Sequence, residues 1–314
     1  MIKLLYGTLA LVLLAVASVY IFIPDQIVIS KVEQVESSDR IISEYLTNKT
    51  KREQWWPAKV SPVSNRDSIN LALKGFQYQF QPGTLSSASV SIIKDNLRTN
   101  SVITWEPVAK STYKVTWRTA FQASKNPVKR FMQYLEARQV KQNMNLILLN
   151  FLTFIVDSKN IYGFDIERQM VKDTILATST MISTTYPETG KIYKLIDEVK
   201  AYAVENGGKP VNVPMLNLSK DSKGTYNTMV ALPIDKNIEN SNTVLVNHMV
   251  AGNILVTEIK GGPGKVAEGF DQMKNYINDF KLISPAMPFE SLVTDRSKEP
   301  DTTKWVTKIY YPIF

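Results

Sequence analysis

The chain has 314 residues, 44% hydrophobic and 21% charged, which is the composition of a folded protein with about two domains. It contains no cysteine, which excludes disulfides, thiolate metal sites, iron–sulfur clusters and cysteine nucleophiles. One histidine, His248, excludes multi-histidine metal centres and leaves little room for a Ser-His-Asp triad. The sequence has neither a P-loop nor a GxGxxG after a strand, so we expect no cofactor and no metal.

The net charge of +8 is concentrated in the first half of the chain. Residues 25–160 hold 19 Lys and Arg against 11 Asp and Glu, whereas residues 161–314 hold 17 against 18. A basic surface suits nucleic acid or anionic lipid, but an ordinary solvated surface is the more common reading. No helix-turn-helix pattern and no basic cluster interleaved with aromatics is present, so we predict no nucleic-acid partner.

Residues 1–24 predict a membrane anchor. Between Lys3 and Asp25 the sequence is uncharged, and the 20 apolar residues from Leu4 to Ile23 match the thickness of a bilayer core. A cleaved signal peptide, with Ala15-Val16-Ala17 as the cleavage site, is the alternative, but the apolar run continues beyond it. Lys3 precedes the span, which predicts a cytoplasmic N-terminus and an extracytoplasmic body.

Residues 25–157 predict a first α+β domain. Alternating apolar residues indicate a strand at 27–32, and Ser37-Ser38-Asp39 predicts the start of a short helix. Strand-like runs follow at 69–80, 87–93, 101–107 and 113–121, and a long amphipathic helix begins at Pro127. This order, together with Trp55-Trp56-Pro57 and the stretch VTWRTAFQASKNPVKRFMQYL, resembles the polyketide cyclase/START-like (SRPBCC) superfamily. The resemblance implies a helix-grip fold with an apolar cavity between sheet and long helix.

Residues 161–314 contain an internal repeat. An ungapped shift of 74 residues aligns 190–218 with 264–292. The identical pairs are Gly190/Gly264, Lys191/Lys265, Asp197/Asp271, Lys200/Lys274, Tyr202/Tyr276, Pro214/Pro288 and Leu218/Leu292. Each copy reads as β-β-α-β-β with one amphipathic helix. Because neither copy can bury its helix and sheet alone, the repeat predicts one eight-stranded antiparallel sheet with both helices on one face. The other face would then be a groove along the pseudo-twofold axis.

The second half also resembles a known family. The stretch GPGKVAEGFDQMKNYI, followed by MPFESLVTD and WVTKIYYPI, is similar to the gyrase-inhibitor-like domain, the effector-binding module of AraC- and MerR-type regulators. The resemblance implies a small-molecule groove in which the glutamate after Phe289 meets cationic aromatic ligands. That residue is Glu290. The chain departs from the family at Gly261-Gly262-Pro263-Gly264, where many members carry an aromatic residue. The loss of that residue puts hydrolytic activity in doubt, although Tyr310 could substitute for it.

Strand alternation extends the predicted site. If Phe289 and Val293 face the helices, Glu290 and Leu292 face the groove. In the last strand Ile309 would pack inward and leave Lys308 and Tyr310 in the groove. By the repeat, Leu216 is the mate of Glu290, and Met229 and Ala231 are the mates of Lys308 and Tyr310. The predicted ligand-binding residues are therefore Glu290, Tyr310, Met229, Leu216, Leu292 and Lys308.

The function predicted from these residues is a membrane-anchored binder or sensor of an apolar, cationic small molecule. A partly buried carboxylate among apolar and aromatic groups favours such a cation. Two alternatives stay open: a hydrolase with Glu290 as general base, and an envelope protein without a ligand, in which Glu290 pairs with Lys308. No residue is predicted to be catalytic, and the oligomeric state stays open.

Overall fold

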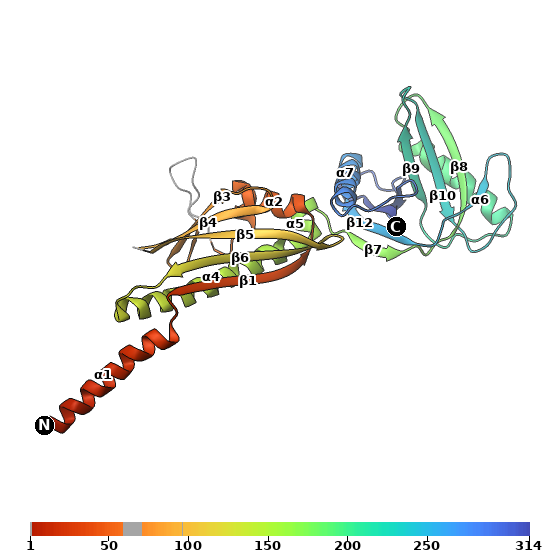
Figure 1. The fold of residues 1–314 in the computed structure, drawn as a ribbon. Helices are drawn as coiled ribbons and strands as arrows, with labels where there is room; N and C mark the ends of the chain where they lie inside the picture. The colour runs from red at the N-terminus through yellow and green to blue at the C-terminus, as the bar shows by residue number, and fades with distance from the viewer. Residues whose placement is uncertain (1, 59–70, 96) are drawn as a thin grey trace. The chain divides into compact units, whose positions relative to one another are not determined.

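The computed structural model describes residues 2–58, 71–95 and 97–314, so the strand start expected at Ile69 lies outside the described residues. The chain divides into two compact units, Met1–Asp157 and Ser158–Phe314 (Figure 1). Both units mix helices with antiparallel sheets, which confirms the predicted α+β class.

The segment predicted as an anchor forms the helix α1 (Ile2–Phe22). In the part of the chain that the structure describes, no helix is both long and apolar enough to cross a membrane, so the predicted transmembrane anchor is unsupported. The end of α1 is tied to the first unit by Arg130, whose Nε donates to the carbonyl of Ile23 at 3.0 Å. The same guanidinium forms an ion pair with Asp25 at 2.8 Å.

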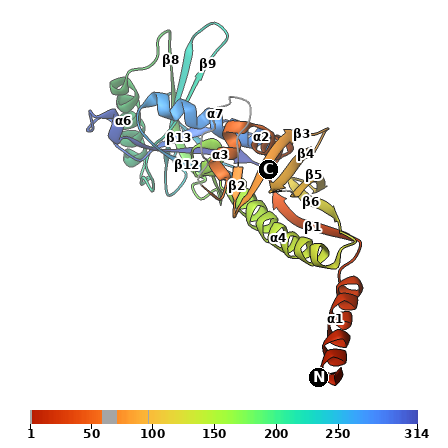
Figure 2. The ribbon, with the colours of Figure 1, turned by 90° about the vertical axis from the view of Figure 1, so that its left-hand side faces the viewer.

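The first unit is a six-stranded antiparallel sheet in the order β1-β6-β5-β4-β3-β2, with a long helix along it (Figure 2). Its strands are β1 (Gln26–Glu36), β2 (Leu71–Leu73), β3 (Phe76–Pro82), β4 (Ser87–Lys94), β5 (Leu97–Ala109) and β6 (Thr112–Gln122). The long helix is α4 (Pro127–Val156), and two short helices, α2 (Asp39–Thr47) and α3 (Lys49–Trp55), lie between β1 and β2 in the chain. The order of strand, small helices, strands and long helix is the one expected from the sequence.

Local chemistry sets the helix starts in this unit. The side chain of Ser38 accepts from the backbone N–H of Ile41 and caps α2. Asn126 caps α4 by accepting from the N–H groups of Val128 and Lys129, and Pro127 supplies a fixed φ at the first helical position. The C-terminal half of α4 buries Met144, Ile147, Leu148, Phe151 and Leu152, and the centre of the Phe151 ring lies 4.8 Å from that of the Trp55 ring.

One strand predicted from the sequence is two. The run expected at 69–80 is interrupted by Lys74 and Gly75, whose φ angles of +48° and +79° form a two-residue turn. The turn joins β2 to β3 as a hairpin in which Leu71 pairs with Tyr78. Positive φ at both turn residues matches the right-handed twist of the strands, so Gly75 marks the break.

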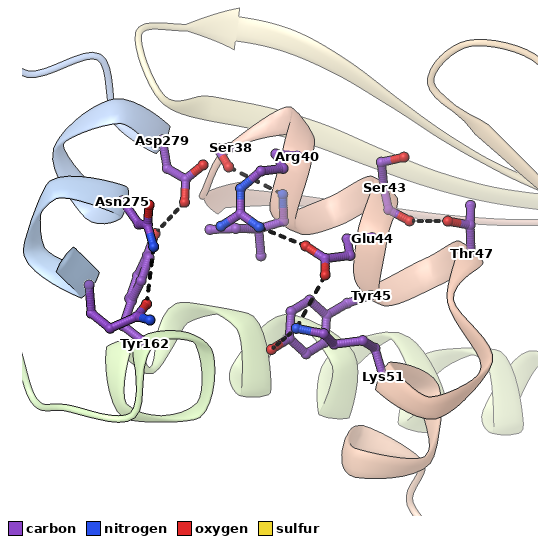
Figure 3. A network of polar contacts seen from close by, with 12 residues as sticks. Ser38, Arg40, Ser43, Glu44, Tyr45, Thr47, Lys51, Tyr162, Asn275 and Asp279 are labelled. Atoms are coloured by element: carbon purple, nitrogen blue, oxygen red, sulfur yellow. Dashed lines mark hydrogen bonds and ion pairs between the residues drawn. The ribbon is translucent and has the colours of Figure 1, made fainter. Parts of the chain in front are cut away.

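A polar network connects α2 and α3 at the surface (Figure 3). Glu44 accepts from Arg40 at 2.6 Å and pairs with Lys51 at 3.2 Å. The ammonium of Lys51 also lies 4.7 Å from the centre of the Tyr45 ring.

Within the second unit, Figure 3 shows Tyr162, whose hydroxyl donates to Asp279 at 2.8 Å. This bond ties the short helix α5 (Ser158–Tyr162) to the end of α7 (Pro263–Asp279).

The second unit is an eight-stranded antiparallel sheet, as the repeat predicts, and its strand order is β11-β8-β10-β9-β13-β14-β12-β7. Its strands are β7 (Glu167–Met170), β8 (Ile175–Ser183), β9 (Met215–Lys220), β10 (Tyr226–Pro233), β11 (Leu245–His248), β12 (Asn253–Lys260), β13 (Phe289–Leu292) and β14 (Val306–Ile313). Its other helices are α6 (Thr189–Glu205), α7 and the short 3₁₀ helix η1 (Thr302–Lys304).

Both long helices of this unit lie on one face of the sheet, as predicted. Val199 of α6 packs with Val230 and Leu292 in one buried cluster. Met273 of α7 packs with Ile259 and Ile309 in a second cluster. Because Glu290 pairs with Ile309 and with Leu216 in the sheet register, both clusters are on the same side. The opposite face is free to form a site.

The pseudo-twofold symmetry includes an exchange of edge strands. β11 belongs to the second repeat but pairs with β8 of the first, and β7 of the first repeat pairs with β12 of the second. Apart from this exchange, the strands of the two halves pair at β9 and β13, in the register pairs Glu290–Leu216 and Ser291–Met215. The exchange therefore links two halves that share a short central seam.

Candidate functional site

An apolar cluster lies on the sheet face opposite α6 and α7. It consists of the buried side chains of Leu176, Met215, Ala231, Ile254, Val256 and Phe289. The loops after β7 and β11 reach over this face, and their residues Val171 and Met249 pack against the cluster. Five strands thus contribute alternate side chains to one apolar surface.

A cavity of about 330 Å³ opens next to this cluster, and its walls are mainly apolar. A volume of this order, lined by hydrophobic side chains with a few polar groups, is typical of small-molecule sites. Strands β9 and β10 form one wall, and segments 247–253, 285–287 and 312–314 form the others. Four methionines line it: Met215, Met229, Met249 and Met287. Their unbranched thioether side chains adapt to the shape of an apolar ligand.

A second, smaller cavity of about 190 Å³ adjoins the first and is more polar. The two share a wall formed by Val171, Met215, Met249 and Phe289. The polar residues of the second cavity are Gln169, Lys172, Asp173, Asn212, Lys308 and Tyr310. An apolar chamber and a polar chamber are therefore adjacent on the same face of the sheet.

Tyr310 connects the two chambers through Phe289. The two rings are stacked, with centroids 5.1 Å apart and an angle of 9° between their planes. Burial, and secondarily the nearby Asp173, raises the pKa of the Tyr310 hydroxyl, which therefore stays protonated and able to donate a hydrogen bond. Asp173 itself accepts from the side-chain amide of Asn212 at 2.8 Å.

The prediction that Glu290 and Leu292 face the groove is wrong. Phe289, expected against the helices, lines both cavities, whereas Leu292 packs in the cluster around α6. Glu290 precedes Leu292 by two residues in β13 and so lies on the helix-bearing face. The alternation was predicted correctly, but its phase was off by one residue, and such a shift exchanges the two faces of a strand.

The carboxylate of Glu290 forms an ion pair with the guanidinium of Arg296. One Nη of Arg296 donates to the Glu290 carboxylate at 2.8 Å and to the hydroxyl of Thr307 at 2.8 Å. The guanidinium also stacks over the ring of Trp305, 4.9 Å from its centre. The side chains of Glu290 and Arg296 are only 12% and 7% exposed. Burial raises the pKa of Glu290, and the charge and hydrogen bond of Arg296 oppose that rise.

The remaining predicted residues divide between the two faces. Met229 lines the large cavity, and Lys308 and Tyr310 line the small one. Leu216 packs against α6 in the helix-side cluster, although part of it also reaches the wall of the large cavity. The structure therefore brings Met229, Lys308 and Tyr310 to the sheet face of the cavities. It separates them from Glu290 and Leu292.

The ion pair considered between Glu290 and Lys308 is absent among the described residues. Lys308 lies instead beside Glu258, at 3.8 Å and with its side chain 40% exposed. His248, at the end of β11, is exposed at the edge of the large cavity.

Sequence reasoning missed Arg296 and the wall residues Met215 and Phe289. Arg296 lies in a polar segment, residues 294–304, whose composition predicts a solvated loop. A signal was available for Met215, because it precedes Leu216 and must occupy the opposite face of β9. Whether Met215 or Leu216 faces the cavity follows from which residues of the paired strand β13 face it.

Neither a family model nor a curated protein matches the chain. Among solved structures, the chain is similar to the EcmrR C-terminal domain, with 15% identity, a TM-score of 0.41 and coverage of 48% of this chain and 98% of that one. It is similar to SAV2435 bound to tetraphenylphosphonium, with 16% identity, a TM-score of 0.32 and coverage of 48% and 94%. It is also similar to the Aha1 dimer from Colwellia psychrerythraea, with 14% identity, a TM-score of 0.31 and coverage of 41% and 96%. Similarities this low assign no family, ligand or activity to the chain.

Proposed function

We propose that the second unit binds an apolar small molecule in the large cavity on the sheet face opposite α6 and α7. The observation that supports this best is a cavity of about 330 Å³ whose walls include four methionines. Burial of apolar ligand surface contributes roughly 25 cal/mol per Å², so such a cavity is a source of affinity without any charge pairing.

The expectation of a cationic ligand loses its physical basis. That expectation depended on Glu290 as a carboxylate in the groove, but Glu290 is on the other face and is neutralised by Arg296. Among the described residues that line the two cavities, Asp173 is the single acidic side chain, and it accepts a hydrogen bond from Asn212. The large cavity selects by shape and hydrophobicity.

The alternative of a hydrolase has one observation in its favour, the raised pKa of Glu290. A general base must reach the proton that it abstracts. Glu290 is buried in an ion pair and lies across the sheet from both cavities, so it does not meet a molecule bound in them. Binding without chemistry is therefore the better reading of this geometry.

The alternative of a purely structural protein predicts a filled groove and a pair between Glu290 and Lys308. The groove instead contains two cavities, and Lys308 lies beside Glu258. These two differences favour a ligand-binding role over a purely structural one.

Titration of the full chain with N-phenyl-1-naphthylamine, a neutral apolar fluorophore, tests the proposal. We expect saturable binding with enhanced emission. The substitution Met229→Trp, which places a larger side chain in the cavity, should weaken binding about tenfold or more, or roughly 1.4 kcal/mol. The matched control is Val204→Trp on the exposed side of α6, where Val204 is 54% exposed. Equal affinities for the parent and Met229→Trp would place the fluorophore elsewhere and refute the proposal.

A further inference from the structure

The two cavities on this face of the sheet have complementary chemistry. The larger one, about 330 Å³, is lined mainly by aliphatic, methionine and aromatic side chains. The smaller one, about 190 Å³, carries two lysines and a tyrosine hydroxyl: Lys172, Lys308 and Tyr310. A molecule that reaches from one to the other needs an apolar part and a polar end.

We propose that the ligand is an anionic amphiphile, such as a medium-chain or long-chain carboxylate, with its tail in the large cavity and its head group beside Lys172, Lys308 and Tyr310. This inference rests on the proposed function, because it names the chemical class that the same site takes.

The polar end carries a net positive charge. Lys172 and Lys308 face a single acidic side chain in the lining, Asp173, whose carboxylate accepts a hydrogen bond from Asn212 at 2.8 Å. The partner of Lys308 outside the lining, Glu258, lies 3.8 Å away and is 60% exposed, which makes it a weak surface pair. Lys172 forms no ion pair within the described part of the chain. Both ammonium groups can therefore turn toward an anion.

Tyr310 adds a neutral donor next to these charges. Burial raises the pKa of its hydroxyl, so the group keeps its proton at neutral pH. A protonated phenol donates to a carboxylate and so favours an anionic head group over an ammonium head group. Its ring stacks on Phe289, which belongs to the wall that the two chambers share.

The shared wall can accommodate a chain that passes between the chambers. Two of its four residues are Met215 and Met249, which are unbranched and have three rotatable side-chain bonds each. The proposal requires these two side chains to rearrange when the ligand binds, with Phe289 held in its stack.

A chain-matched series of probes tests the inference on the full-length protein. Decanoate, 1-decanol and decyltrimethylammonium share a ten-carbon tail and differ in head group. Their affinities are measured by displacement of N-phenyl-1-naphthylamine. Because hydrogen bonds to a charged partner are among the stronger ones in proteins, we expect decanoate to bind about tenfold more tightly than 1-decanol. Decyltrimethylammonium should bind most weakly.

The double substitution Lys172→Gln/Lys308→Gln should remove the preference for decanoate and leave the affinity for 1-decanol within about twofold. The control is Lys298→Gln/Lys304→Gln, which removes the same charge from side chains that are 83% and 63% exposed outside the lining. It should change neither affinity.

Two results would overturn the inference while leaving the proposed function intact. One is equal displacement by decanoate and 1-decanol, and the other is a preference for decanoate that survives the Lys172→Gln/Lys308→Gln substitution. If none of the three probes displaces the fluorophore, and the fluorophore itself does not bind, the proposed function fails as well.

Discussion

At the scale of single residues, the ion pair of Glu290 and Arg296 determines whether Glu290 has a structural or a ligand-binding role. A carboxylate and a guanidinium with side chains 12% and 7% exposed are costly to bury, and they are tolerated because each satisfies the other. Arg296 also donates to the hydroxyl of Thr307, and its guanidinium lies over the ring of Trp305. The pair therefore belongs to the core between sheet and helices.

The substitution Arg296→Met tests this structural role. It leaves Glu290 buried without its cation, so we expect a loss of about 3 kcal/mol or more in the free energy of unfolding at pH 7. Denaturation in urea measures this loss. Lys298→Met is the control, because its pair with Asp295 is exposed and should contribute less than about 1 kcal/mol.

The same variant should depend on pH in a defined direction. Burial raises the folded-state pKa of Glu290 above its ordinary value of 4.5, and removal of Arg296 takes away the groups that oppose this rise. A carboxyl with a raised folded-state pKa contributes stability below its ordinary pKa, and this contribution is lost as the pH rises through the folded-state pKa. The cost of Arg296→Met should therefore be smaller at pH 4 than at pH 7. An equal cost at both values would contradict the assignment.

At the scale of elements, the contact of α7 with the sheet depends on Gly269. A Cβ atom at this position would lie 2.7 Å from Cδ1 of Ile309 and 2.9 Å from Cδ1 of Ile259. These distances are shorter than van der Waals contact, so the helix approaches the sheet closely only because residue 269 has no side chain.

The substitution Gly269→Ala should destabilise the protein by about 1 kcal/mol, since overpacking outweighs the gain in helix propensity. Gly264→Ala in the same helix is the matched control. A Cβ atom there meets nothing within 4 Å, so this variant should be neutral or more stable by up to about 1 kcal/mol. Thermal unfolding of both variants measures the difference, and a stabilised Gly269→Ala would show that α7 can move away from the sheet.

Sequence patterns predicted the elements better than their pairing. The cluster Ser37-Ser38-Asp39, the proline at 127 and the alternating strands are local signals, and each produced an element where expected. The hairpin at Lys74-Gly75 was local as well, but the alternating apolar residues on both sides of it were read as one strand. The sheet face on which the side chain of Glu290 lies is not set by neighbouring residues in the sequence. It depends on whether Phe289 stacks on Tyr310 of a different strand.

At the scale of the whole molecule, the repeat determined the architecture of the second unit but not its edges. The 74-residue shift implies two equivalent halves, and the eight-stranded sheet follows from pairing them. That β7 and β11 exchange halves depends on the packing of long-range strands, for which the sequence has no local signal. The exchange also places the loops after β7 and β11 over the sheet, where Val171 and Met249 close the cavities.

The measurement that tests the central claim most directly is a methyl NMR titration of the full chain, labelled at its ten methionines, with N-phenyl-1-naphthylamine. The account predicts that the ring of the fluorophore shifts the methyl signals of the four methionines lining the large cavity: Met215, Met229, Met249 and Met287. The signals of Met144 in the first unit and Met273 on the helix side, both fully buried, should stay in place. Shifts at Met144 or Met273 without shifts at the four cavity methionines would contradict the proposed site.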